Sequence, residues 1–103
     1  MLKIFPFTCY LVGEDNLIIQ CAEILLTRSH FILGIVSKLA AVKEWAYKNQ
    51  IPYFSSLKSA KVNMEESKFD YLFSITDDSQ SISGELIRYP QKLAINYHDS
   101  LLP

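Results

Sequence analysis

The segment Phe7–Gly13 reads FTCYLVG. A short run that is almost wholly apolar, rich in aromatic and β-prone residues and ended by glycine is typical of a strand buried on both faces. Such strands belong to parallel sheets, in which helices cover both faces. We therefore predict a buried strand over Phe7–Val12, followed by a helix that Asp15 or Asn16 caps.

Apolar strands and helical segments alternate along the rest of the chain. Further strands are expected at 31–36, 51–54, 71–75 and 93–97, and helices after residue 16, from about 39 to 48 and around 84–89. Pro52 favours an edge position for its strand, and the polar segment 55–68 predicts a short helix or an exposed loop. Right-handed βαβ units then give an α/β fold, with an open parallel sheet of about five strands and helices on both faces.

Composition narrows the class of protein. The 103 residues are 50% hydrophobic and carry a formal net charge of −1, with no basic run that would favour binding to nucleic-acid phosphates. The sequence lacks the signal-peptide pattern and the long apolar segment that a membrane span needs, so we expect a cytoplasmic protein without membrane contact. Cys9 and Cys21 lie in apolar patterns and are interpreted as buried thiols of a reducing compartment.

Several other polar residues are interpreted as surface, loop or capping residues rather than as parts of a binding site. The turn after the first strand lacks the glycine-rich phosphate-binding patterns, and Glu14 and Asp15 there would repel a phosphate. The pair Asp77-Asp78 is interpreted as a solvated loop, so no metal site is expected. His30 has no evident partner in the pattern and is interpreted as a surface or capping residue.

Asn96 and His98 are the candidate catalytic residues. They lie two positions apart at the end of the last expected strand, so they share one face of it. In open parallel sheets, ligands bind beyond the carboxyl ends of the strands. An imidazole titrates near neutral pH and suits proton transfer, and an amide N–H can hold a carbonyl oxygen that gains negative charge during acyl transfer.

The chain resembles a known family at these residues. Its last eight positions read Asn-x-His-x-Ser-Leu-Leu-Pro, which is similar to the active-site signature of the folate-dependent formyltransferases. Residues 9–17, 35–37, 69–75 and 93–99 together resemble the formyltransferase-like domains that open some nonribosomal peptide synthetase hybrids. The likeness covers nearly all of the chain.

The resemblance implies a Rossmann-like domain that moves a formyl group from 10-formyltetrahydrofolate, as co-substrate, to an amine. Asn96 would hold the formyl oxygen, and His98 would assist charge stabilisation and proton transfer. The loop 76–83 would flank the pterin ring of the folate, and residues from Ser100 on would begin the loop beside the active site. The folate-binding residues implied are Thr76, Asp77, Ser79, Ile82, Ser100 and Leu101.

Two departures from the family pattern shape the expectation. The family's third catalytic residue is an Asp well downstream, so residues 1–103 would be the N-terminal portion of a formyltransferase-like domain, catalytically incomplete as given. The loop 76–83 is polar where relatives carry apolar residues and a proline. The last strand would expose a sheet edge, from which we expect marginal stability or self-association.

Two other functions are alternatives to formyl transfer. The first is a non-catalytic binding or interaction module with a formyltransferase-like fold, which would show no saturable folate binding. The second is a small flavodoxin-like domain, which would carry a flavin. If the likeness to peptide synthetases holds, the acceptor amine belongs to an aminoacyl group on a carrier domain.

Overall fold

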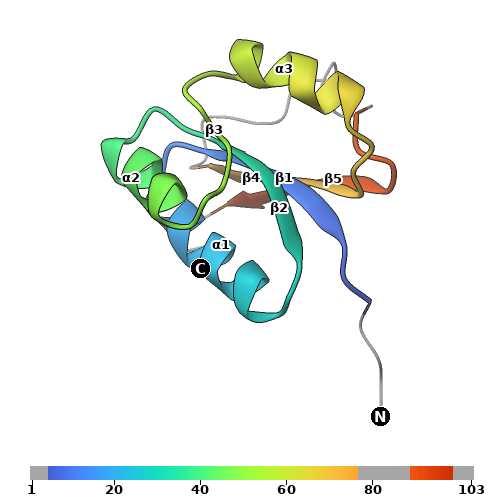
Figure 1. The fold of residues 1–103 in the computed structure, drawn as a ribbon, viewed down its shortest axis with the longest axis horizontal. Coiled ribbons are helices and arrows are strands. Elements are labelled where there is room, and N and C mark those ends of the chain that lie inside the picture. The colour runs from blue at the N-terminus through green and yellow to red at the C-terminus, as the bar shows by residue number, and fades with distance from the viewer. Residues whose placement is uncertain (1–4, 77–88, 99–103) are drawn as a thin grey trace.

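The computed structural model describes residues 5–76 and 89–98, and within them the strands form one parallel sheet. The strands are β1 (Thr8–Gly13), β2 (Phe31–Val36), β3 (Tyr53–Phe54), β4 (Tyr71–Thr76) and β5 (Leu93–His98). They lie in the order β3-β2-β1-β4-β5, as Figure 1 shows. Every strand pair is parallel, which confirms the predicted α/β class.

This strand order identifies the sheet as Rossmann-like. From β1 the chain steps outward to β2 and β3, and then crosses back to place β4 on the other side of β1. The direction of winding therefore reverses between β1 and β4. A flavodoxin-like sheet has the order 2-1-3-4-5, so the flavodoxin-like interpretation is wrong for this chain.

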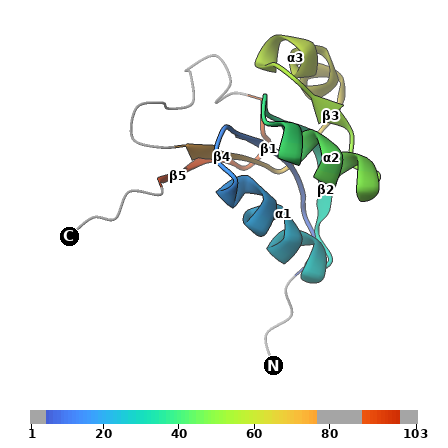
Figure 2. The same ribbon diagram turned by 90° about the vertical axis from the view of Figure 1, so that its left-hand side faces the viewer.

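Helices cover both faces of the sheet. Helices α1 (Leu17–Thr27) and α2 (Ala40–Lys48) lie on one face, and α3 (Leu57–Glu66) lies on the other, as Figure 2 shows. Each face has its own apolar cluster, because neighbouring residues of a buried strand point to opposite faces. Buried residues on the α1/α2 face include Cys9, Leu11, Ile18, Ala22, Ile35, Val42 and Ala46. Those on the α3 face include Tyr10, Val36, Ala60, Met64, Phe69 and Leu72.

The predicted element boundaries hold to within two residues where the structure describes them. The polar segment 55–68 contains helix α3, which Ser56 caps by accepting a hydrogen bond from the Ser59 N–H at 3.2 Å. Strand β3 lies at the edge of the sheet, as Pro52 predicted. The helix predicted around residues 84–89 lies outside the described residues, apart from Tyr89.

Helices α1 and α2 end in the same way. After α1, the N–H of Ser29 donates to Leu26 O and the N–H of His30 donates to Leu25 O. Ser29 has a φ of 66°, so this is a Schellman motif with a left-handed residue that is not glycine. The same motif follows α2, where Gln50 has a φ of 57°. The left-handed residue after α2 is Gln50, one residue beyond the C-cap Asn49, whose φ is −101°.

His30 is buried, which corrects its interpretation as a surface or capping residue. Only 6% of it is exposed, and its ring stacks on Phe7 with 3.7 Å between centroids. Its Nδ1 accepts a hydrogen bond from the Phe7 N–H at 3.2 Å. The Schellman motif after α1 turns the chain back toward the sheet, and this turn brings His30 beside the segment that enters β1.

Hydrogen bonds join the amino ends of β1 and β4. The carboxylate Oδ2 of Asp70 accepts from the Thr8 N–H at 3.0 Å, and the Asp70 N–H donates to Thr8 Oγ1 at 3.1 Å. Asp70 comes directly before β4, so this exchange sets the register of β4 against β1. Cys9 is fully buried next to this pair.

None of the helices in the described ranges has the length and hydropathy to cross a membrane.

Gly13 allows the carboxyl ends of β1 and β4 to come together. It pairs with Ile75, and a Cβ at position 13 would overlap the carbonyl oxygen of Ile75 and lie 3.1 Å from its carbonyl carbon. We expect Gly13→Ala to lower the free energy of unfolding by about 3 kcal/mol, because the backbone must move to admit the methyl group. Urea denaturation measures this. Gly34→Ala is the comparison, since the added methyl would meet the rings of Tyr10 and Phe54, and we expect a smaller loss.

The two free cysteines should differ in reactivity. Burial, with the nearby Asp70 carboxylate as a second cause, raises the pKa of the Cys9 thiol from 9.0 to about 12. Burial also raises the pKa of Cys21, which is partly exposed on α1. At pH 8 we expect iodoacetamide to label Cys9 more than about 10-fold more slowly than Cys21, since the thiolate is the nucleophile. Mass spectrometry of digested protein over a time course measures both rates, and equal rates would contradict this.

The raised pKa of Cys9 also makes stability depend on pH. The folded state holds the thiol proton more tightly than the unfolded chain does, so the stabilisation is complete below pH 9 and is lost as the pH rises toward 12. A Cys9→Ala variant should show a weaker loss of unfolding free energy over this range, and a Cys21→Ala variant should differ less from the parent chain, because the pKa of Cys21 is raised in the same direction but by less.

Candidate functional site

The carboxyl ends of the strands meet at one edge of the sheet, because all five strands are parallel. At this edge Val12 of β1 pairs with Val36 of β2, and Gly13 pairs with Ile75 of β4. The winding of the sheet reverses between β1 and β4. Open α/β sheets bind ligands in the crevice at such a reversal, so this edge is the place to look for a site.

The candidate catalytic residues are at this edge. The backbone of Asn96 pairs with Ser74, and that of His98 pairs with Thr76. Both candidates therefore belong to the last part of β5, which is where the sequence predicted them, and the structure places β5 next to β4. Asp77, Ser79, Ile82, Ser100 and Leu101 lie outside the described residues. Thr76 is the last residue of β4.

The turn after β1 bonds to the turn after β2. Oε1 of Glu14 accepts a hydrogen bond from the Lys38 N–H at 2.7 Å and one from the Ser37 hydroxyl at 3.3 Å. Oγ of Ser37 in turn accepts from the Leu39 N–H at 3.1 Å. Glu14 and Ser37 therefore accept from the N–H groups of Lys38 and Leu39, the two residues that directly precede α2.

Two neighbouring contacts complete this arrangement. The carboxylate Oδ1 of Asp15 accepts from the Leu17 N–H at 2.8 Å, so Asp15, and not Asn16, supplies the side-chain cap of α1. The Tyr53 hydroxyl donates to the carbonyl oxygen of Ser37 at 2.6 Å. Ser37 is fully buried and links β2, β3 and the β1 turn.

These contacts divide the carboxyl edge of the sheet into two parts. At the ends of β1 and β2, Asp15 occupies an N–H group at the start of α1, where an anion would otherwise bind, and Glu14 occupies the Lys38 N–H in the turn before α2. The other part comprises the ends of β4 and β5, beside Gly13, which carries no side chain. A site on the described edge is therefore better placed at β4 and β5 than at the first turn.

Sequence reasoning missed the role of Glu14. It treated Glu14 and Asp15 together as charges that exclude a phosphate, and only Asp15 as a helix cap. A polar cap was expected for the helix from about residue 39, but its N-cap residue Leu39 has no side-chain cap, and Ser37 bonds instead to the Leu39 N–H just before the helix. Its partner Glu14 lies 23 residues away from Ser37, and no local pattern links the two.

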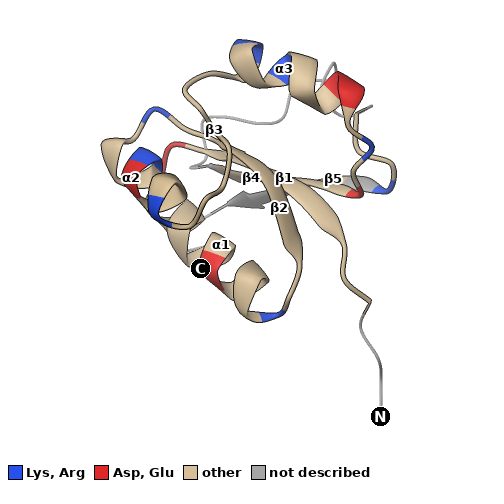
Figure 3. Cartoon of the chain, in the orientation of Figure 1, with Lys and Arg blue, Asp and Glu red and all other residues tan. Residues whose placement is uncertain are grey.

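The described residues show neither a metal cluster nor a single-sign charged face. Within 5–76 and 89–98, no three His, Cys, Asp or Glu side chains converge as metal ligands would. Lys and Glu are mixed on α2, and α3 carries lysines in its first half and glutamates at its end, as Figure 3 shows. This mixture offers no broad basic surface on those two helices.

No protein-family model and no curated protein matches the chain. A family assignment therefore rests on the quoted motifs and on the geometry described above.

Removal of the Glu14 carboxylate should destabilise the fold at the turns after β1 and β2. We expect Glu14→Ala to lower the free energy of unfolding by about 1–2 kcal/mol, because the buried Ser37 hydroxyl and the Lys38 N–H both lose an acceptor. Glu14→Gln keeps a carbonyl oxygen and should lose less. Glu66→Ala at the exposed end of α3 is the control and should stay within about 0.5 kcal/mol of the parent. Urea denaturation of the four proteins ranks them.

Proposed function

We propose that this chain takes part in formyl transfer from 10-formyltetrahydrofolate to an amine acceptor. The observation that carries the proposal is the position of Asn96 and His98. Both are in the last part of β5, in register with Ser74 and Thr76 of β4, in a sheet with Rossmann-like strand order. This is the edge at which such sheets bind ligands.

The proposed roles follow from the chemistry of the two residue types. The Asn96 amide would donate a hydrogen bond to the formyl oxygen, which gains negative charge as the acceptor amine attacks. His98 would take up and return a proton near neutral pH. Alternation along β5 assigns positions 94, 96 and 98 to one face. Ala94 packs against the cluster beneath α3, which makes the α3 side the proposed site of reaction.

The co-substrate is proposed to lie against the ends of β4 and β5. There it would contact Thr76, Asp77, Ser79 and Ile82 on one side and Ser100 and Leu101 on the other. The engaged carboxylates of Glu14 and Asp15 fit a ligand that is not held by a phosphate at the first turn. The co-substrate supplies the one-carbon group, and the chain supplies orientation and proton transfer.

The same proposal covers the acceptor, the remaining catalytic residues and the cellular compartment. The acceptor would be an amine, for which an aminoacyl group on a carrier domain is the candidate that the peptide-synthetase resemblance suggests. Further catalytic machinery, including the family's downstream Asp, would come from sequence beyond Pro103. Cys9 and Cys21, both free thiols, are consistent with a reducing cytoplasmic compartment.

A second candidate function is a non-catalytic interaction module with the same fold. Among the described strands, β5 pairs only with β4, so its other edge presents backbone groups that could pair with another chain. Self-association through this edge is part of that alternative. It predicts a concentration-dependent oligomer and no folate binding.

Formyl release from 10-formyltetrahydrofolate tests the proposal. The 103-residue chain and, where its gene continues past Pro103, the longer product are each assayed by folate absorbance with an amine present. In the form that turns over, we expect His98→Ala to lower the rate at least about 100-fold, and Asn96→Ala about 100-fold to 1000-fold. Both variants should still bind folate, since neither holds the pterin ring.

Matched control variants distinguish a loss of catalysis at Asn96 or His98 from a general effect of removing a polar side chain. Asn63→Ala removes an exposed amide on α3, and Gln91→Ala removes one just before β5, so neither should change the rate. Full activity in His98→Ala would overturn the catalytic proposal. Absence of saturable folate binding in every form would overturn it too and would favour the interaction module.

A further inference from the structure

An open groove lies between helix α2 and β3, the strand at one side edge of the described sheet. Its volume is about 600 Å³, and its lining residues are Ala40, Lys43, Glu44, Tyr47, Ile51 and Tyr53. The four helical residues among these form one flank of α2. Val42 and Ala46 face the buried cluster, and Trp45 donates a hydrogen bond to Glu23 of α1 at 3.3 Å. The groove is therefore on the flank of α2 that packs against neither the sheet nor α1.

The walls of the groove are mainly apolar and accessible. Tyr47 is 85% exposed, the largest exposure among the large hydrophobic residues in the described part of the chain. Ile51 and Tyr53 are half-buried beneath it. The Tyr53 hydroxyl is held by the Ser37 carbonyl, so its ring forms a fixed floor. A largely exposed tyrosine above a fixed apolar floor is typical of a surface that a partner covers.

Strand β3 offers a backbone edge beside this floor. The Ile35 N–H donates to Pro52 O and the Ser37 N–H donates to Phe54 O, so the groups of these two residues point toward β2. Because alternate residues of a strand direct their backbone groups to opposite sides, the N–H and C=O of Tyr53 point away from β2. No other described strand pairs with that side of β3. An extended chain could therefore pair with Tyr53.

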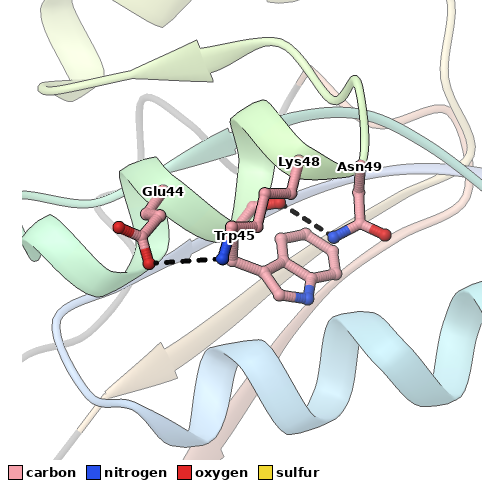
Figure 4. Close-up of polar contacts among 4 residues, drawn as sticks. All are labelled: Glu44, Trp45, Lys48 and Asn49. Atoms are coloured by element: carbon pink, nitrogen blue, oxygen red, sulfur yellow. Dashed lines mark hydrogen bonds and ion pairs between the residues drawn. The ribbon is translucent and has the colours of Figure 1, made fainter.

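The charges around the groove leave one cation uncompensated. Glu44 forms an ion pair with Lys48, at 3.6 Å between Oε1 and Nζ, as Figure 4 shows. In the same view the Asn49 amide closes the helix end by donating to Trp45 O at 2.8 Å. Lys43 has no ion-pair partner among the described residues. Lys43, Glu44 and Lys48 together carry a net charge of +1, so an acidic group is the complementary occupant.

We infer that the α2–β3 groove is a docking site for an extended acidic peptide, which adds a strand beside Tyr53 and directs an acidic side chain to Lys43. Strand addition obtains affinity from main-chain hydrogen bonds and specificity from alternate side chains. Apolar residues flanking the acidic one would contact Tyr47 and Ile51. The groove is open along the sheet edge, whereas small-molecule sites enclose most of their ligand, and this favours a peptide.

The experiment begins with random seven-residue peptides displayed on phage and selected against the immobilised 103-residue chain. The binders are then made as capped synthetic peptides and titrated into the ¹⁵N-labelled chain by NMR. We expect enriched sequences with alternating β-prone residues and an acidic residue among them. Their binding should shift the amide signals of Tyr53 and Tyr47. Replacing the acidic residue of a peptide by its amide should weaken binding about threefold to tenfold.

Variants of the chain locate the contacts. Lys43→Glu should weaken binding of the acidic peptide about tenfold, and Tyr47→Ala should weaken it to a similar degree. Lys58→Glu makes the same charge change on α3, on the other face of the sheet, and should leave the affinity within twofold. Since Lys43, Tyr47 and Lys58 are all exposed, all three variants should keep the parent melting temperature.

Several outcomes would overturn the inference. Selection that yields no binder, or binders whose signals shift elsewhere on the chain, would remove the groove as a docking site. Equal affinity for the acidic peptide and its amide, together with no effect of Lys43→Glu, would remove the acidic partner. Binding of anionic lipid vesicles but of no peptide would assign the surface to a membrane instead.

Discussion

The parallel pairing of β1 with both of its neighbours is the constraint on which the rest of the structure depends. β1 is the central strand of the described sheet, between β2 and β4, and it is buried on both faces. Because it is central, its residues contribute to both apolar clusters: Cys9 and Leu11 to one, Tyr10 to the other. The helices on either side therefore pack against the same strand, and the position of each follows from it.

The two ends of β1 are held in different ways. At its amino end, Thr8 and Asp70 exchange hydrogen bonds, and His30 accepts the N–H of Phe7. At its carboxyl end no side chain intervenes, because Gly13 lies directly against the Ile75 backbone. The amino end is thus closed by side chains. The carboxyl end brings backbone groups of β1 and β4 close together, and the Rossmann-like strand order makes this the edge at which a ligand would bind.

Much of this architecture could be predicted from local patterns. The apolar run 7–12 and the alternation of strands and helices indicated a parallel sheet with covered faces, and the structure confirms both. Pro52 indicated an edge strand. Asn96 and His98 were placed at the carboxyl end of the last described strand, where the backbone register now aligns them with Ser74 and Thr76. These predictions succeeded because strand periodicity and residue propensity act over a few neighbouring residues.

The partners of individual polar residues could not be predicted in this way. His30 was interpreted as a surface residue, yet it is buried against Phe7, 23 residues earlier in the chain. Asp70 bonds to Thr8 over a separation of 62 residues, and Glu14 accepts hydrogen bonds from Ser37 and Lys38 in the turn before α2. The sequence by itself determined the class of fold, the order of its elements and the position of an amide and an imidazole at the end of β5. Only the tertiary structure decided the strand order and which buried polar groups satisfy one another, because burial makes an unpaired group costly and only the folded chain brings these partners together.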